Sequence, residues 1–141
     1  MQIYMVCHDT TYGDLDYDDD WQEQINDRVF DGPGTRWSAF DCKFVHYEKK
    51  PDCPDCVGLG YCFALGESAI DVLREHLAPV AELLPIKARG CNQEYRMLNV
   101  TSVIPALDFD KSDVSWRLEW RCDINRHVFK IDEIGDATLF R

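Results

Sequence analysis

The sequence predicts an α+β fold, a single domain of mainly antiparallel sheet with one clear helix over about residues 68–78. Its 141 residues, 45% of them hydrophobic, are enough for one domain with its own core. Apolar and polar residues alternate at 40–45 and at 116–122, which is typical of half-buried strands. One segment, 68–78, repeats its apolar residues at helical spacing. No repeat, low-complexity tract or long linker divides residues 1–141.

The first quarter of the chain predicts a strand, a second helix and a loop. Met1–Cys7 is apolar and precedes turn-forming residues, as an opening strand would. Apolar residues recur every four positions in Trp21–Val29, directly after three aspartates, and this pattern is compatible with a short helix. The run Asp-Gly-Pro-Gly at 31–34 then predicts a loop.

The middle of the chain begins with a strand pattern. Phe40, Cys42 and Phe44 alternate with polar residues, so one face of this strand should be buried. Lys49–Gly60 contains two prolines and two glycines and predicts a loop. Tyr61–Leu65 predicts a further short strand.

The clear helix has a start signal, a buried stripe and a stop signal. Ser68 is a suitable N-cap because its hydroxyl can accept a free backbone N–H. Ile70, Leu73 and Leu77 lie on one face of the helix and predict its contact with the core. Pro79 should end the helix because it has no backbone N–H to donate.

The last third of the chain predicts more sheet. Tyr95–Leu107 is rich in strand-forming residues. Trp116 and Trp120 alternate with charged residues and are predicted to form the core of a final hairpin. The predicted turn of that hairpin is near Asp123–Arg126, with its second strand at Val128–Ile134.

Charge is distributed very unevenly along the chain. There are 26 acidic and 15 basic side chains, for a formal net charge of −11. Residues 1–31 carry nine acids and one base, a net charge of −8, and the acids all lie within residues 9–31. A field of that sign repels nucleic acid and anionic membranes and favours a basic protein partner.

The chain has no pattern typical of export or of membrane insertion. The longest uncharged stretches, Cys56–Gly66 and Met97–Leu107, have 11 residues each, well short of the roughly 20 that span a bilayer. Met1–His8 contains no basic residue and is followed by an aspartate, unlike a signal peptide. We therefore expect a cytoplasmic protein that does not bind membranes.

Seven cysteines suggest an alternative function. Without an export signal, they are expected to be reduced thiols. Cys53 and Cys56 have the two-residue spacing of a zinc knuckle, and Cys62, Cys42 or His46 could complete four ligands. The alternative is therefore a small zinc-binding or regulatory module. No catalytic motif is present, so we predict neither an enzyme nor a cofactor.

Several short segments in the middle of the chain follow one another in a characteristic order. They are Leu65-Gly66-Glu67-Ser68, the helix Ala69–Leu77, Glu82–Ile86, Tyr95–Val100, Ala106-Leu107-Asp108 and Ser112. This order, over about residues 50–112, resembles the immunity-protein eleven family of bacterial polymorphic-toxin systems. The chain departs from that pattern by stopping at Arg141, where the members compared continue into a further helical segment. The cysteines at 53, 56 and 62 are also not a feature of the family.

The resemblance implies a non-enzymatic protein that binds and neutralises a cognate bacterial toxin by occluding its active site. A toxin that attacks nucleic acid has to be basic, so the acidic segment is the expected contact surface, with an aromatic anchor among its carboxylates. The residues expected to contact the toxin are Asp14, Asp16, Asp18, Asp19, Asp20, Trp21 and Glu23.

Overall fold

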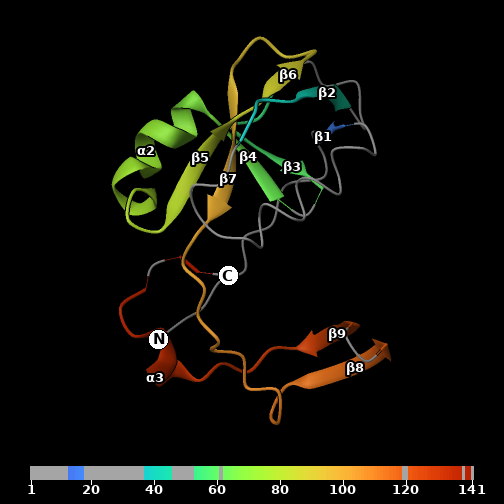
Figure 1. The fold of residues 1–141 in the computed structure, drawn as a ribbon, viewed down its shortest axis with the longest axis vertical. Helices are drawn as coiled ribbons and strands as arrows, with labels where there is room; N and C mark the ends of the chain where they lie inside the picture. Colours follow the sequence, from blue (N-terminus) through green and yellow to red (C-terminus); the bar gives the residue numbers. More distant parts are fainter. Residues whose placement is uncertain are drawn as a thin grey trace.

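The structure of the chain is a computed structural model, which describes residues 13–17, 37–45, 53–60, 62–118, 121–137 and 139–140. It contains a seven-stranded sheet with a helix packed on it, and a C-terminal hairpin with a one-turn helix (Figure 1). The predicted fold class, α+β with one clear helix, is confirmed. The elements are β1 (Asp14–Asp16), β2 (Asp41–Val45), β3 (Cys56–Leu59), β4 (Cys62–Gly66), α2 (Glu67–Leu77), β5 (Ala81–Pro85), β6 (Lys87–Arg89), β7 (Tyr95–Val100), β8 (Asp113–Leu118), β9 (Arg121–Arg126) and α3 (Ile131–Ile134).

The seven strands lie in the order β5-β7-β4-β3-β1-β2-β6. Four of the six pairings are antiparallel, as predicted, whereas β1 with β3 and β2 with β6 are parallel. Strands that are distant in the sequence therefore become neighbours. In particular, β1 is inserted between β3 and β2, so that the acidic N-terminal part of the chain enters the middle of the sheet.

One face of the sheet carries the larger core. The predicted strand at 40–45 is confirmed as β2, with the preceding Phe40 and the strand residues Cys42 and Phe44 buried. They pack with Leu15 of β1 and Met97 of β7. Because side chains alternate across a strand, the residues between these core positions have to face the other side of the sheet.

Helix α2 covers that other side over β4, β5 and β7. Its Ile70 and Leu77 pack with Leu65, and Leu83 and Leu98 complete this smaller core. The helix ends at Leu77, two residues before Pro79, as predicted. Leu73, which was expected in the buried stripe, is 37% exposed.

The predicted N-cap is wrong. The helix begins at Glu67, its N-cap is Gly66, and no side chain caps it. Gly66 is also the last residue of β4, so the strand passes into the helix without a loop. This leaves Ser68 inside the first turn, where it cannot act as the cap.

The predicted loop at Lys49–Gly60 is wrong in its last part, since Cys56–Leu59 forms β3 and pairs with β4. Val57 and Leu59 are buried on the larger core, and this burial outweighs the low strand propensity of Gly58 between them. The turn after β3 uses Gly60 at φ +59°, a conformation that favours glycine.

The C-terminal hairpin differs from the prediction in its turn. Strand β8 ends at Leu118 and its antiparallel partner β9 begins at Arg121, so the turn is not near Asp123–Arg126, which lies within β9. The alternation at 116–122 therefore belongs to two strands. Part of the predicted second strand, Ile131–Ile134, is a one-turn helix, and β7 ends at Val100 rather than at Leu107. The predicted elements at Met1–Cys7 and Trp21–Val29 lie outside the described residues.

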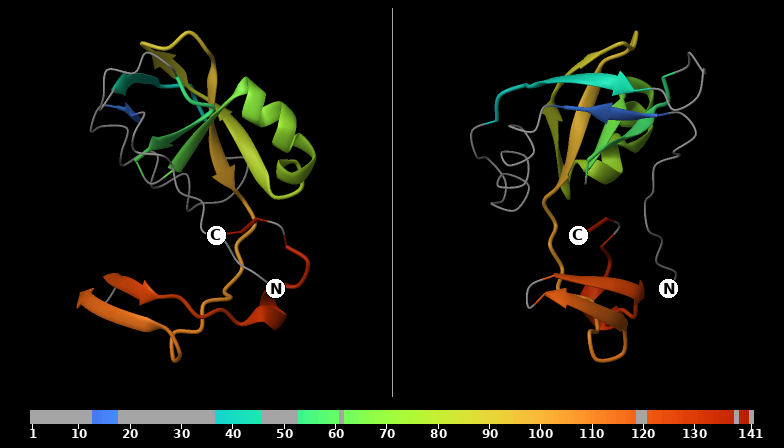
Figure 2. Two further views of the ribbon diagram at one scale, coloured as in Figure 1. Left: turned by 180° about the vertical axis from the view of Figure 1, so that it is seen from behind. Right: turned by 90° about the vertical axis from the view of Figure 1, so that its right-hand side faces the viewer.

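An extended segment after β7 carries the chain away from the large sheet to the hairpin (Figure 2). An antiparallel bridge joins Leu107, which precedes β8, to Phe129, which follows β9. Among the described residues, no helix is long and apolar enough to cross a membrane.

Candidate functional site

Strands β1, β2 and β6 present a face of charged side chains, which we call the charged face. Asp16 of β1 lies opposite Lys43 of β2, and Lys43 lies opposite Arg89 of β6. On the neighbouring row, Asp41 lies opposite Lys87. With Asp14, which is also on β1, the charged face consists of Asp14, Asp16, Asp41, Lys43, Lys87 and Arg89.

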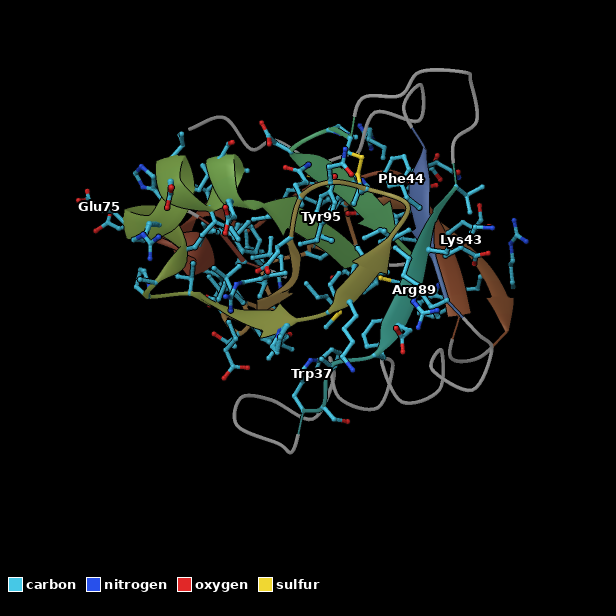
Figure 3. All side chains as sticks on the ribbon, turned by 90° about the horizontal axis from the view of Figure 1, so that it is seen from above. Trp37, Lys43, Phe44, Glu75, Arg89 and Tyr95 are labelled. Atoms are coloured by element: carbon cyan, nitrogen blue, oxygen red, sulfur yellow. A yellow bond between two sulfur atoms is a disulfide. The ribbon has the colours of Figure 1, made fainter. Side chains whose placement is uncertain are left out.

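The core on the opposite side holds this face in place. Leu15, Cys42 and Phe44 are buried and alternate with the charged residues. A one-residue shift in the register of either strand would therefore expose these apolar side chains and bury the charges. Figure 3 shows Lys43 and Arg89 at one end of the molecule, with Glu75 of α2 at the opposite end. All members of the charged face are exposed except Asp14, which is half-buried.

An ion pair crosses the charged face. The Arg89 guanidinium donates from Nη2 to Asp41 Oδ1 at 2.7 Å and from Nε to the same oxygen at 3.1 Å. Both side chains are more than half exposed, so this pair is expected to contribute little stability, about 0–1 kcal/mol. It orients two charges on the surface without removing either from solvent.

The structure places two of the seven predicted contact residues on this face. Asp14 and Asp16 are on β1, where Asp16 Oδ1 accepts the Tyr17 backbone N–H at 3.0 Å. The other five, Asp18, Asp19, Asp20, Trp21 and Glu23, lie outside the described residues.

The charged face is not uniformly acidic. Its three carboxylates are balanced by three basic side chains, Lys43, Lys87 and Arg89. The sequence-based prediction missed these bases because β6 follows β2 by more than 40 residues and pairs with it in parallel. The alternation of apolar and polar residues in β2 was enough to place Lys43 on the exposed side of this strand.

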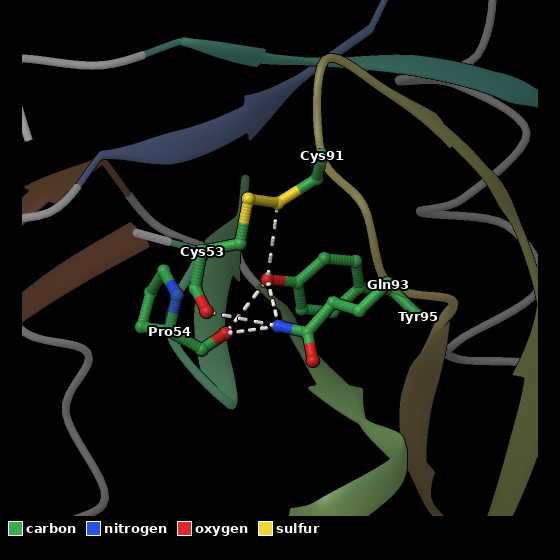
Figure 4. The surroundings of a disulfide bond; sticks show 5 residues. All are labelled: Cys53, Pro54, Cys91, Gln93 and Tyr95. Atoms are coloured by element: carbon green, nitrogen blue, oxygen red, sulfur yellow. Dashed lines mark hydrogen bonds between the residues drawn. A yellow bond between two sulfur atoms is a disulfide. The ribbon is translucent and has the colours of Figure 1, made fainter. Parts of the chain in front are cut away.

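A disulfide corrects the expectation that all the cysteines are reduced. Cys53 bonds to Cys91, with Cα atoms 6.0 Å apart and a sequence separation of 38 (Figure 4). The bond connects the segment before β3 to the segment between β6 and β7. No local motif indicates a pair at this separation, and the bond takes up one of the two thiols of the CxxC spacing at Cys53 and Cys56.

Hydrogen bonds reinforce the same junction. Gln93 Nε2 donates to the carbonyl oxygens of Cys53 and Pro54, both at 3.0 Å, and contacts the Tyr95 hydroxyl at 2.6 Å (Figure 4). The Tyr95 hydroxyl donates to the Pro54 carbonyl at 2.7 Å. Burial raises the pKa of Tyr95, and the charge of Asp55 adds to the rise, so the phenol stays protonated and able to donate. This network holds the start of β3 in place.

Two of the described free thiols, Cys42 and Cys56, show no sign of activation. Burial, aided by the charge of Asp41, raises the pKa of Cys42 to about 11, and burial also raises the pKa of Cys56. Both thiols are therefore protonated at neutral pH and poor nucleophiles. Within the described ranges, no group of three His, Cys, Asp or Glu side chains could hold a metal ion.

A second surface was misread from the sequence. Trp116, predicted as hairpin core, is 61% exposed and stacks on Phe109, with ring centroids 6.2 Å apart and an interplanar angle of 22°. Phe109 is itself 53% exposed. The hairpin buries less than its alternating pattern predicts, because β8 and β9 are paired only with each other among the described strands.

Comparison with known proteins supplied no relative. The chain matches no protein-family model, and no curated protein or solved structure is significantly similar to it.

Proposed function

We propose that this protein is a bacterial immunity protein, which binds a cognate toxin in the cytoplasm and neutralises it by occluding its active site. One observation carries the proposal: Asp14 and Asp16, which open the acidic part of the chain, lie on the charged face outside the cover of α2. The resemblance over about residues 50–112 supports it from the sequence. On this proposal the protein is not an enzyme and needs no cofactor.

The distribution of charge suits such a role. Residues 1–31 carry a net charge of −8 and can attract a basic, nuclease-like toxin over some distance. The mixed charges of the charged face can then favour one orientation of the toxin, because like charges brought together cost several kcal/mol. On this proposal the acidic segment attracts the toxin, and the charged face beside it orients the toxin.

A growth assay tests the function itself. The candidate toxin is the C-terminal domain of the product of the neighbouring gene, which on this proposal is a large secreted protein. Expression of that domain alone should arrest a bacterial host, and co-expression of this protein should restore growth. An arrest that co-expression does not relieve, or a neighbouring gene without any toxic product, would contradict the proposal.

A second experiment tests the contact surface. Asp16→Asn with Asp18→Asn should slow association with the toxin by about 3- to 10-fold at low salt and reduce its salt dependence, since two steering charges are lost. The matched control is Glu75→Gln with Asp136→Asn, which removes two exposed charges elsewhere. Equal effects of both pairs on the association rate would move the contact away from β1 while leaving the immunity function intact.

A further inference from the structure

One edge of the β8–β9 hairpin is unpaired among the strands that the structure describes. Strand β8 pairs with β9 on one side, and no other described strand pairs with it. In both Figure 1 and the left view of Figure 2, β8 is the strand farther from the large sheet. An isolated two-stranded hairpin is at best marginally stable in water, so this one gains from a further strand.

The hairpin also has an apolar side that is partly uncovered. Val114 and Ile124 lie opposite each other and are half-buried, and Trp116 is the next residue on the same side of β8. Phe109 stacks on Trp116, and both rings are more than half exposed. Exposed aromatic rings of this size at a strand edge are typical of binding surfaces.

The charges on the polar side of β8 would pair with those of an identical antiparallel strand. Asp113 and Arg117 lie two residues to either side of Ser115, with opposite charges. Within the hairpin, Asp113 lies opposite Arg126, and Arg117 forms an ion pair with Asp123. The regular part of the ladder, between two register shifts, is Val114–Trp116 and is centred on the same serine.

We propose that β8 pairs with β8 of a second copy of this chain, antiparallel and centred on Ser115, to give a four-stranded sheet. In this register Asp113 lies opposite Arg117 of the second copy, and Val114 lies opposite its Trp116. Opposite charges and an aromatic with a β-branched residue are both favourable cross-strand pairs. The two-fold symmetry repeats each pair, as in most homodimers.

Charges then alternate in sign across the four strands. They run from Arg126 to the opposite Asp113 of one copy, and then from Arg117 of the other copy to its diagonal ion-pair partner Asp123, which lies opposite Ser115. A parallel pairing would instead place Asp113 beside Asp113, and pairing with β6 would bring Lys87 and Arg89 to an edge that carries one acid and one base. The antiparallel second copy therefore matches β8 better than either alternative.

Charge-swap variants test the proposal by sedimentation. Wild-type protein should show a monomer–dimer equilibrium over about a hundredfold range of concentration. Asp113→Arg alone and Arg117→Asp alone place like charges opposite each other across the interface, so each should weaken the dimer by about tenfold or more. An equimolar mixture of the two variants should restore dimers, because their charges are complementary.

The mixture controls for damage to the hairpin itself. Arg117→Asp also places a carboxylate near Asp123 of the same chain, and mixing does not relieve that repulsion. Recovery in the mixture therefore reports pairing between copies. A monomeric wild-type protein, single variants that dimerise normally, or a mixture that does not recover would each overturn the proposal, whatever the toxin assay shows. Protection of β8 amides from exchange by a toxin, with no dimer, would assign the edge to that partner instead.

Discussion

The seven-stranded sheet and the C-terminal hairpin use the same alternating pattern but reach very different degrees of burial. In the sheet, β7 lies between β5 and β4 with α2 across one face, and its Met97 is fully buried. In the hairpin each strand has a single neighbour among the strands that the structure describes, and Trp116 remains 61% exposed. Alternation therefore shows which side of a strand is apolar, whereas burial depends on what covers that side.

The largest expected effect contrasts one aromatic residue from each region. Phe40 is 1% exposed, and its ring makes T-shaped contacts with the rings of Tyr17 and Trp37. Phe40→Ala should lower the free energy of unfolding by about 3–5 kcal/mol through lost burial and a cavity. Trp116→Ala should cost less than about 1 kcal/mol in protein dilute enough to be monomeric. Urea denaturation followed by circular dichroism measures both, and equal losses would show that the two regions do not differ.

The next effect concerns the junction of the large sheet. Cys53→Ser with Cys91→Ser should lower the free energy of unfolding by about 2–4 kcal/mol, because the disulfide closes a long loop and restricts the unfolded chain. Thermal unfolding with and without a reductant measures the loss. The wild-type protein should be destabilised by the reductant, and the double variant should not respond to it.

The same disulfide bears on where the protein works. Disulfides are rare in the cytoplasm, where thiols are kept reduced. Peptide mapping of protein extracted under alkylating conditions would show whether Cys53 and Cys91 are joined in the cell. A cross-linked pair in most molecules would contradict the proposed cytoplasmic location, and a reduced pair would support it.

The smallest expected effect is a pH-dependent change in stability at Asp108, just before β8. The hydrogen bond and ion pair from Lys111, with Nζ 2.9 Å from Oδ2, lower the pKa of Asp108 below its usual 3.8. A lowered pKa in the folded state stabilises it above the unfolded pKa, and this contribution is lost as pH falls from about 4 through the folded value. Hydrogen exchange at residues 108–112 should therefore speed up in acid, after correction for intrinsic rates. In Asp108→Asn this acid-dependent change should disappear, and a change as large as in the wild-type protein would exclude the carboxyl as its cause.

Local sequence patterns predicted the elements whose apolar residues recur at one regular spacing. Strand β2 has a clear two-residue alternation, and the helix that ends before Pro79 has apolar residues at helical spacing and a stop signal. Strand β3 was missed because Gly58 within it, Gly60 after it and the nearby prolines favour a loop locally, while pairing with β4 and burial of Val57 outweigh them. The turn of the hairpin was misplaced because the same alternation continues on both sides of it.

For the candidate site, the sequence identified the acidic segment and therefore Asp14 and Asp16, but not their basic neighbours. Lys43, Lys87 and Arg89 reach this face through pairing of β1 with β2 and of β2 with β6. Such pairing depends on strand order, which no local period encodes. The charged face is consequently a product of topology.

The sequence by itself determined the α+β class, the helix, the buried side of β2 and the concentration of negative charge in the first 31 residues. These features depend on residues a few positions apart, so the spacing of apolar and charged residues along the chain is enough to predict them. The tertiary structure alone decided the Cys53–Cys91 bond, the balance of charge around Asp16 and the exposure of Trp116. Each of these depends on which distant segments meet, and that is settled by packing of the whole chain.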